Sequence, residues 1–180
     1  MSKLWIGSDL HWAHKNIHKF RCKDKGFYRD FEDETEHREW IKDWWKAHIR
    51  KRDTVILLGD VAFKEEALLE IGTMPGRKVL VKGNHDLKKS CYYDKVFDQV
   101  HGLLRYKHCW LSHAPVHPQE LREKFNIHGH THHYDIPDSR YTNVCVESLM
   151  KIFGTPFIGW TDLVEYRSTL ETECKECEYD

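Results

Sequence analysis

Short apolar runs alternate with amphipathic segments along the 180-residue chain. The runs are bounded by glycine, serine or charged residues, which predicts short buried β-strands. They occupy residues 4–6, 55–58, 79–81, 108–111, 125–127 and 141–146. Because helical segments separate several of these strands, the order of the elements predicts an α/β protein.

The longest predicted helix follows Asp33. Asp33 and Glu36 have the spacing of a capping box, and apolar residues recur at helical spacing over roughly four turns after them. This stripe consists of Trp40, Ile41, Trp44, Trp45, His48 and Ile49. Because one periodicity accounts for all of them, the tryptophans are predicted to belong to the core rather than to a base-stacking surface.

Two shorter helices are predicted further along the chain. The first covers residues 65–71 and is stopped by Gly72 and by Pro75-Gly76. The second covers residues 162–170 and closes the fold. A mixed segment without a clear period lies between them, around residues 91–97.

The chain is long and apolar enough for one domain, with 40% hydrophobic residues and no internal repeat or linker. A single domain is predicted over residues 1–170, followed by an acidic, flexible tail at 171–180. Cys174 and Cys177 in that tail have the spacing of half a zinc site or of a redox pair. No second pair accompanies them, and this favours a solvated tail.

The overall charge excludes some classes of protein. The 28 basic and 29 acidic residues leave a net charge of -1, so the chain has no global basic footprint for nucleic acid. It has no apolar run of about 18 residues, and we expect no membrane span. The N-terminus lacks the long apolar region of a signal peptide. A cytoplasmic setting with reduced thiols is therefore expected for the six scattered cysteines.

Histidine is unusually frequent, with 14 residues, and several histidines follow predicted strands. Five strand-like runs end in residues that bind divalent metals, and glycines stand beside them. The metal-binding candidates are Asp9, His11, Asp60, Asn84, His113, His130 and His132, and the glycines are Gly7, Gly59, Gly83 and Gly129. Alternate residues of an extended loop point the same way, so two of them can hold one ion. A single Asp-x-His pair arises by chance, whereas five such loops in order predict a site.

These residues resemble the five motifs of the calcineurin-like metallophosphoesterases, complete and in order, from residue 4 to about residue 147. The motifs are Asp9-x-His11, Gly59-Asp60, Gly83-Asn84-His85-Asp86, His113 and Gly129-His130-x-His132. The stretches 8–17 and 143–147 are more narrowly similar to small phage and bacterial members, in which glycine usually stands at the position of Ala13. The resemblance implies an α/β fold in which a β-sandwich of two mixed sheets is flanked by helices, as in the metallo-dependent phosphatases.

The resemblance also implies two divalent metal ions. One would be held by Asp9, His11, Asp60 and His132, and the other by Asp60, Asn84, His113 and His130, with Asp60 as the bridge. The physical chemistry agrees, because an anionic bridge offsets the repulsion between two cations. Two carboxylates leave a positive surplus that favours phosphate oxygens. The mixed oxygen and nitrogen ligands favour Mn²⁺, with Fe, Zn²⁺ or Ni²⁺ as alternatives.

By the same resemblance, a metal-bridging hydroxide attacks phosphorus and His85 is the general acid, with Asp86 orienting its ring. The alternative for His85 is a hydrogen bond to a phosphate oxygen without proton transfer. His14 and Asn16 are candidates for the substrate pocket, although positions at a helix start without substrate contact would explain them equally well. His128, in the same loop as two ligands, is a candidate support for them.

The expected activity is hydrolysis of small or nucleotide-like phosphoesters. The protein Ser/Thr phosphatases of this superfamily carry an arginine that Gly59-Asp60-Val61-Ala62-Phe63-Lys64 lacks. Since that arginine helps to hold a phosphomonoester dianion, its absence favours a phosphodiesterase. One alternative is a nuclease of the same superfamily, which the near-neutral charge disfavours. The other is a non-catalytic scaffold, which would need neither His85 nor a complete ligand set.

Overall fold

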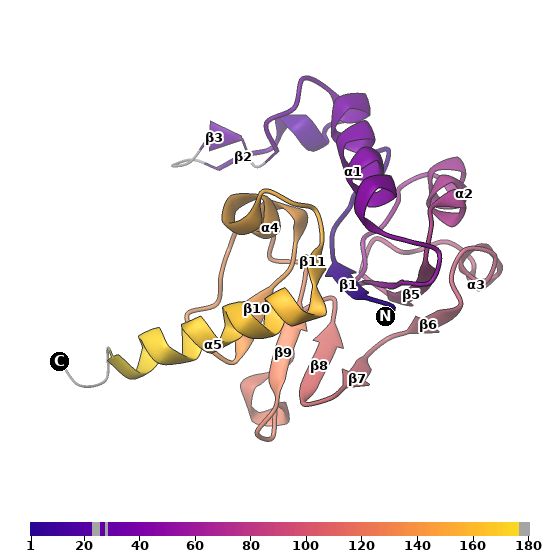
Figure 1. The fold of residues 1–180 in the computed structure, drawn as a ribbon. Coiled ribbons are helices and arrows are strands. Elements are labelled where there is room, and N and C mark those ends of the chain that lie inside the picture. The colour runs from indigo at the N-terminus through magenta and orange to yellow at the C-terminus, as the bar shows by residue number, and fades with distance from the viewer. Residues whose placement is uncertain (23–25, 28, 177–180) are drawn as a thin grey trace.

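The computed structural model describes residues 1–22, 26–27 and 29–176, without the side chains of 21–22, 26–27 and 171–176. Its first sheet has five strands in the order β11-β1-β4-β5-β6, of which β11 is antiparallel to β1 and the other neighbours are parallel (Figure 1). The bounds are β1 Leu4–Gly7, β4 Thr54–Leu57, β5 Arg77–Val81, β6 Gln99–His101 and β11 Ile158–Gly159.

The second sheet has four strands in the order β10-β9-β8-β7. Its strands are parallel except for the antiparallel pair β7 and β8. The bounds are β7 Leu104–Tyr106, β8 Cys109–Ser112, β9 Phe125–His128 and β10 Tyr141–Asn143. A two-stranded ribbon of β2 Arg21–Cys22 and β3 Gly26–Phe27 stands apart from both sheets (Figure 1).

Helices flank the two sheets. They are α1 Glu34–His48, α2 Glu65–Thr73, α3 Ser90–Tyr93, α4 Val146–Phe153 and α5 Trp160–Glu176, with short 3-10 turns at Ile17–Lys19 and Pro118–Glu120. Figure 1 shows α1 and α2 beside the first sheet and α5 running across the second. The predicted α/β class, with two mixed sheets flanked by helices, is confirmed. In the described part of the chain, no helix is long and apolar enough to cross a lipid bilayer.

The central strands are buried on both faces, and successive residues alternate between two cores. Ile56 and Val79 lie in a cluster with Leu111 and Ile127 of the second sheet. Their neighbours Val55, Leu57 and Leu80 lie in a cluster with Ile41, Trp45, Leu68 and Ile71 of α1 and α2. The first sheet is therefore packed between the second sheet and the helices.

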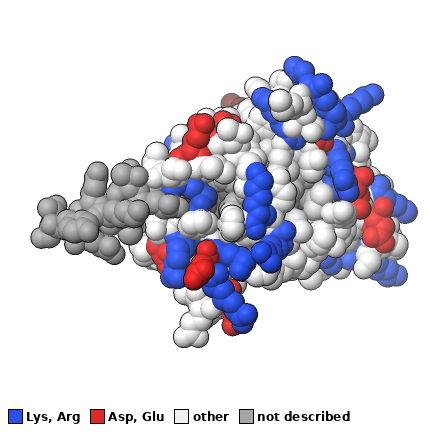
Figure 2. Space-filling view, turned by 60° about the horizontal axis from the view of Figure 1, so that its bottom comes forward, with Lys and Arg blue, Asp and Glu red and all other residues white. Residues whose placement is uncertain are grey.

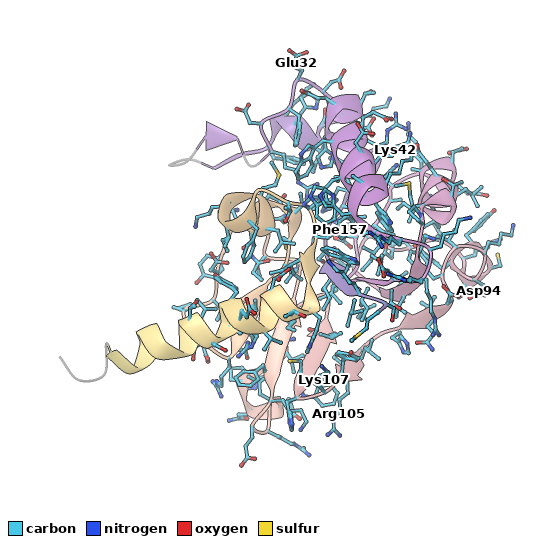
Figure 3. All side chains as sticks on the ribbon, viewed as in Figure 1. Glu32, Lys42, Asp94, Arg105, Lys107 and Phe157 are labelled. Atoms are coloured by element: carbon cyan, nitrogen blue, oxygen red, sulfur yellow. The ribbon has the colours of Figure 1, made fainter. Side chains whose placement is uncertain are left out.

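The stripe predicted after Asp33 is confirmed as core. Ile41, Trp45 and Ile49 are buried, and Trp40 and Trp44 are half-buried against the same cluster. Phe157 completes this core, with its ring 4.9 Å from that of Trp45, and Figure 3 places it inside the molecule. His48 differs, because it is exposed and stacks on Trp44 from outside.

The cap of α1 matches half of the predicted capping box. The Glu36 backbone N–H donates to Oδ1 of Asp33 at 2.9 Å, as expected for an N-cap. The Glu36 carboxylate, however, accepts from the backbone N–H of Glu32 rather than from that of Asp33. Glu36 therefore anchors the chain one residue before the cap, and Figure 3 shows Glu32 at the outer edge of the fold.

The strand predicted at 141–146 is wrong beyond Asn143. The Asn143 side chain accepts from the backbone N–H of Cys145, a local turn that takes the chain out of the sheet. Cys145 then pairs with Ser8, and α4 begins at Val146. This helix was not predicted, because Val146 was assigned to the strand and the residues after it to no element.

Other boundaries also differ from the predictions. The helix α2 runs through Gly72 to Thr73, so Pro75 marks its end better than the glycine does. The short strands β6, β7 and β11 were not predicted. The backbone of α5 continues to Glu176, so the predicted flexible tail is helical for most of its length. The side chain of Cys174 and all of Cys177 lie outside the described residues.

Charged side chains are mixed on the surface. On the face shown in Figure 2, Lys and Arg are spread with acidic side chains among them. Arg105 and Lys107 point outward at the β7–β8 end of the molecule, and Asp94 does so near α3. This distribution agrees with the near-zero net charge.

Candidate metal centre

All seven predicted metal ligands lie in loops at the carboxyl ends of β1, β4, β5, β8 and β9. Parallel neighbouring strands end at the same edge of a sheet, so their loops meet there. Because the two sheets pack face to face, both sets of loops converge at one end of the shared core. Hydrogen bonds cross between them, as from the backbone N–H of His130 to Oδ2 of Asp9 at 2.9 Å.

The backbone of these loops is unusual. Nine non-glycine residues of the described chain have positive φ, and five of them are predicted ligands. These five are Asp9, His11, Asp60, His130 and His132, with φ between 48° and 70°. Side chains rarely adopt this left-handed region, and clusters of such residues mark functional sites. The backbone of these loops is therefore strained at five of the seven predicted ligands.

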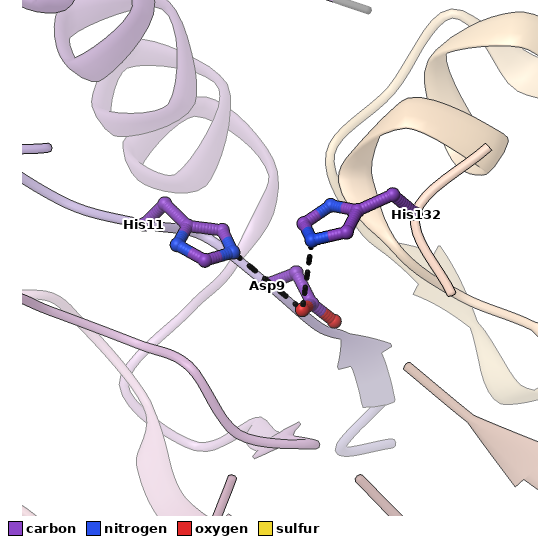
Figure 4. A group of neighbouring side chains, drawn as sticks. All are labelled: Asp9, His11 and His132. Atoms are coloured by element: carbon purple, nitrogen blue, oxygen red, sulfur yellow. Dashed lines mark ion pairs between the residues drawn. The ribbon is translucent and has the colours of Figure 1, made fainter. Parts of the chain in front are cut away.

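A first group consists of Asp9, His11 and His132 (Figure 4). Oδ1 of Asp9 lies 3.6 Å from Nε2 of His11 and 4.0 Å from Nε2 of His132. Oδ1 of Asp9 and Nε2 of His11 are buried and have no hydrogen-bond partner. These distances are too long for hydrogen bonds. They suit ligands of one cation, since bonds of about 2.1 Å place two ligands about 3–4 Å apart.

A second group surrounds His113, whose Nε2 lies 2.8 Å from Oδ1 of Asn84, 3.1 Å from Nδ1 of His130 and 3.5 Å from Oδ2 of Asp60. Nδ1 of His113 lies 2.8 Å from the carbonyl oxygen of Leu58, so Nδ1 carries a proton. In the neutral ring, Nε2 then has no hydrogen and carries a lone pair, which faces the acceptor oxygens of Asn84 and Asp60. A cation between these atoms would satisfy all of them.

The two groups are connected through Asp9. Ligand atoms of Asp9, Asp60 and His113 lie within 4.8 Å of one another, and Asp9 also belongs to the first group. Both sets of predicted ligands are therefore brought together, with Asn84 and His130 beside the second group. The bridging role of Asp60 remains a prediction.

Each carboxylate uses one oxygen as an anchor and turns the other to the group. Oδ2 of Asp9 accepts from Oγ of Ser8 at 2.6 Å, from the backbone of His130 and from Sγ of Cys145 at 3.2 Å. Oδ1 of Asp60 accepts from the backbone N–H of His85 at 2.8 Å. Such hydrogen bonds fix the direction of a ligand before a metal binds.

Two glycines allow this close packing. A Cβ atom at Gly129 would collide with Oγ of Ser8 and Oδ2 of Asp9, and one at Gly83 would collide with Oδ1 of Asp60. Of the four glycines predicted beside the ligands, these two are therefore needed because the backbone approaches a carboxylate.

Two buried residues that were not predicted support His132. Oε1 of Glu147 accepts from Nδ1 of His132 at 3.0 Å and from Nε of Arg29 at 2.9 Å. Arg29 also donates to the backbone oxygens of Asp9 and Leu10. Glu147 lies in a stretch that carried the family resemblance, whereas no sequence signal pointed to Arg29. A metal-binding histidine commonly donates its other N–H to a carboxylate.

The charges of this centre follow from these contacts. Burial raises the pKa of Asp9, but His11, His113 and His132 outweigh it and hold that pKa well below its usual range. Burial likewise raises the pKa of Glu147, but Arg29 and His132 bring it down to about 2. Both carboxylates are therefore ionised at neutral pH.

The imidazoles respond in opposite directions. Burial lowers the pKa of His11, and the nearby carboxylate of Asp9 only partly opposes this. Burial also lowers the pKa of His132, but the hydrogen bond to Glu147 outweighs it and the net shift is upward.

His85 lies at the mouth of the centre. Its side chain is half exposed, and its Nε2 lies 3.9 Å from Oδ2 of Asp60. The prediction that Asp86 orients this ring is wrong. Oδ2 of Asp86 accepts from the backbone N–H groups of Asp60 and Gly83, and Oδ1 accepts from that of Val61. Burial raises the pKa of Asp86. Asp86 therefore joins two ligand loops, and the carboxylate beside the His85 ring is that of Asp60.

A cavity of about 350 Å³ adjoins the centre. Its lining includes His85, His14 and Phe63 together with the predicted ligands His11 and His132. His14 thus lines a cavity beside the centre, and its contact with a substrate remains a prediction. Asn16 is exposed at the start of the 3-10 turn Ile17–Lys19, outside the described residues that line the cavity.

His128 is fully buried in the loop that carries His130 and His132. Its Nδ1 lies 2.9 Å from the carbonyl oxygen of Gly129, so the ring braces this loop from within. The predicted supporting role of His128 is consistent with this contact.

Three similar proteins place the chain among relatives. The gene 66 protein of Mycobacterium phage L5 is 31% identical in an alignment of 169 residues, with a coverage of 73% of this chain and 78% of that protein. The uncharacterized protein MJ1445 of Methanocaldococcus jannaschii is 30% identical in an alignment of 163 residues, with a coverage of 82% of this chain and 83% of that one. The crystal structure of AQ665 from Aquifex aeolicus, a protein of unknown function, matches with a TM-score of 0.66 at 25% identity. It covers 92% of this chain and 100% of AQ665. No family model matches the chain.

Proposed function

We propose that this chain, which belongs to the same protein family as the phage L5 gene 66 protein and MJ1445, is a metal-dependent phosphodiesterase. It would hydrolyse a P–O bond of a small or nucleotide-like phosphodiester. The proposal rests on the geometry of the ligand loops and on their resemblance to the calcineurin-like metallophosphoesterases.

One observation carries the proposal. Buried atoms that normally find a hydrogen-bond partner, Oδ1 of Asp9 and Nε2 of His11, are left without one and face each other. An unpaired buried polar atom is costly, and an unpaired buried charge more so. A cation coordinated by both would remove that cost. The acceptor atoms around Nε2 of His113 support a second cation by the same reasoning.

The proposed ligands divide between the two groups. Asp9, His11 and His132 would hold one divalent ion, and Asp60, Asn84, His113 and His130 the other. Mn²⁺ suits this mixture of oxygen and nitrogen donors. Divalent ions at such a site neutralise phosphate charge and lower the pKa of water.

The residues of the chain would supply orientation and a proton. In its protonated form, His85 donates a proton from Nε2 to the leaving oxygen of the ester. Oδ2 of Asp60 lies 3.9 Å from that nitrogen, and Oδ1 accepts from the backbone N–H of the same residue, so Asp60 fixes the loop that carries the ring. The half-exposed position of His85 leaves room for a leaving group to depart.

The cavity beside the centre supports a diester. A monoester presents one ester group, whereas a diester has a second that needs space beside the phosphate. The cavity of about 350 Å³ provides that space. The missing arginine after Asp60 favours the same substrate, because no guanidinium fork from this motif holds a dianion.

The decisive experiment combines metal binding with hydrolysis. We expect the purified chain to bind Mn²⁺ and then to hydrolyse bis-p-nitrophenyl phosphate, with no activity after chelation. Mn²⁺ binding without hydrolysis of this diester, of p-nitrophenyl phosphate or of DNA would instead favour a scaffold. Faster cleavage of single-stranded or duplex DNA than of the small diester would favour a nuclease.

A further inference from the structure

A row of aromatic rings runs along the cavity beside the candidate metal centre. The centre of the Phe63 ring lies 5.3 Å from that of His11, with the two rings stacked at 22°, and 4.5 Å from that of His14. The His14 ring in turn lies 5.4 Å from that of Phe20. All four residues line the cavity. The row therefore leads from a predicted metal ligand, His11, to Phe20 at its other end.

Two members of this row are phenylalanines that lie outside the core. Phe20 is 46% exposed, and Phe63 is half-buried. Among the residues that the structure describes, neither belongs to the two apolar core clusters or to the partly buried side chains packed against them. A phenylalanine ring stabilises a fold mainly through burial, so a ring held outside the core keeps apolar surface for a ligand.

The position of the row indicates what would cover it. The same cavity is lined by His11 and His132 of the first ligand group and by His85 at the mouth of the centre. The Phe63 ring lies 5.2 Å from that of His85. A phosphate held at this ligand group would have one of its ester groups in the cavity. The occupant is therefore expected to be part of the substrate rather than a separate ligand.

The charges of the lining narrow the chemistry of that ester group. The described residues that line the cavity include no lysine or arginine. A second phosphate would therefore find no lysine or guanidinium to pair with. An aromatic ring, in contrast, gains attraction from offset or edge-on contact with other rings, beyond the effect of the buried area. Nucleobases stack on aromatic side chains in the same way.

We infer that this row is a subsite for an aromatic ring of the substrate, an aryl group or a nucleobase carried by one ester group, and that Phe20 and Phe63 select it. The inference rests on the proposed phosphodiesterase function and specifies its substrate class. The cavity volume of about 350 Å³ is at the small end for ligand pockets, so it suits one ring system.

Phosphinates test the subsite by binding alone. They carry one negative charge, as a phosphodiester does, and their two P–C bonds are not hydrolysed. Benzyl(methyl)phosphinate and cyclohexylmethyl(methyl)phosphinate are titrated calorimetrically into the Mn²⁺-loaded chain. We expect the benzyl compound to bind about 2- to 10-fold more tightly, the range of a contact between rings. The cyclohexyl ring buries at least as much apolar surface, so equal or tighter binding of that compound would overturn the inference.

Phe20→Leu removes a ring but keeps an apolar side chain, with Phe153→Leu as the matched control. Phe153 is 37% exposed and also stands beside a ring, that of Tyr166 at 5.3 Å, but it lies at the end of α4 and outside the cavity lining. We expect the ratio of the two Kd values to fall to about one in Phe20→Leu. It should stay that of the wild type in Phe20→Tyr and Phe153→Leu. An unchanged ratio in Phe20→Leu would contradict the assignment.

A third phosphinate, methyl[2-(adenin-9-yl)ethyl]phosphinate, distinguishes the two kinds of ring. Tighter binding than that of the benzyl compound assigns a nucleobase to the subsite, and weaker binding assigns an aryl group.

The subsite and the proposed function fail in different ways. Hydrolysis of bis-p-nitrophenyl phosphate, with equal Kd values for the benzyl and cyclohexylmethyl compounds, would sink the subsite but leave the phosphodiesterase function standing. A benzyl preference that disappears in Phe20→Leu, without hydrolysis of any diester, would support ring binding and sink the proposed function instead.

Discussion

Nε of Arg29 lies 2.9 Å from Oε1 of Glu147, and both side chains are buried although 118 positions separate them in the sequence. The same oxygen accepts from Nδ1 of His132. Arg29 also donates to the carbonyl oxygens of Asp9 and Leu10. One guanidinium therefore braces two ligand loops of the candidate metal centre, one through its backbone and the other through a carboxylate.

Replacing Arg29 should weaken both the fold and the metal centre. Arg29→Gln leaves the buried carboxylate of Glu147 without its cation, which costs about 3–5 kcal/mol of unfolding free energy. The loss of support for His132 should lower Mn²⁺ affinity by about 10- to 100-fold. Urea unfolding and calorimetric titration with Mn²⁺ measure the two effects.

Arg167→Gln is the control for Arg29→Gln. Arg167 is 5% exposed and donates to Thr142, away from the ligand groups. We expect this variant to lose stability but to keep its Mn²⁺ affinity. Equal losses of affinity in the two variants would show that the effect of Arg29 is only structural.

Asp60→Asn should change the number of metal ions bound. Of the four residues proposed to hold the second ion, Asp60 alone has a carboxylate, so the substitution removes the anionic ligand from that set. We expect two Mn²⁺ per chain in the wild type and at most one in the variant, with hydrolysis of the diester lost. Asp53→Asn is the matched control. Asp53 is equally buried, but its carboxylate accepts from the backbone N–H groups of Lys3 and Arg50 and belongs to neither ligand group. Two tightly bound ions in Asp60→Asn would refute the assignment.

His85→Ala should slow esters according to their leaving groups. An alkyl leaving group needs a proton from His85, whereas p-nitrophenolate hardly does. We expect kcat to fall about 10²- to 10⁴-fold for an alkyl diester and much less for bis-p-nitrophenyl phosphate. Steady-state rates on the two substrates decide the matter. A similar fall for both would leave His85 with phosphate binding alone.

Asp86→Asn should act on the loops rather than on proton transfer. Asp86 accepts three backbone N–H groups, and an amide would present a donor to at least one of them. A loss of about 1–3 kcal/mol of unfolding free energy is expected. The leaving-group dependence of hydrolysis should stay that of the wild type. Asp98→Asn is the control, because the Asp98 carboxylate accepts from one backbone N–H, that of Lys78, and this variant should lose less unfolding free energy.

Glu70 should make stability depend on pH in acid. Burial raises its pKa, but Trp12, Lys42 and Arg38 outweigh this and lower it to about 2. A lowered folded-state pKa stabilises the fold above the unfolded value of about 4.5, and this contribution disappears as pH falls through about 2.

The Glu70→Gln variant measures this contribution. At pH 7 it should be less stable than the wild type by about 1–3 kcal/mol, and the difference should shrink as pH falls below about 4.5. Glu66→Gln, an exposed residue on the same helix, should show no such dependence. Urea unfolding at pH 7 and at pH 3 provides the comparison, and a constant difference would contradict the assignment.

Much of the fold was predictable from local pattern. The apolar runs at β1, β4 and β5 are continuous because both faces of those strands are buried, and α1 shows its stripe because only one of its faces is. The convergence of the seven proposed ligands was also predictable, since they lie in loops that follow strands and together resemble a family pattern. In contrast, β6, β7 and β11 are too short to carry a period of their own.

The sequence by itself determined which residues are candidates for metal binding and in what order they follow the strands. Only the tertiary structure decided which oxygen of Asp9 is anchored, what Asp86 holds, and that Arg29 and Glu147 meet behind His132. The physical reason is that ligand identity depends on residue type and spacing, which are local. Hydrogen bonds between loops depend on how two sheets pack, and no local pattern encodes a contact across 118 residues.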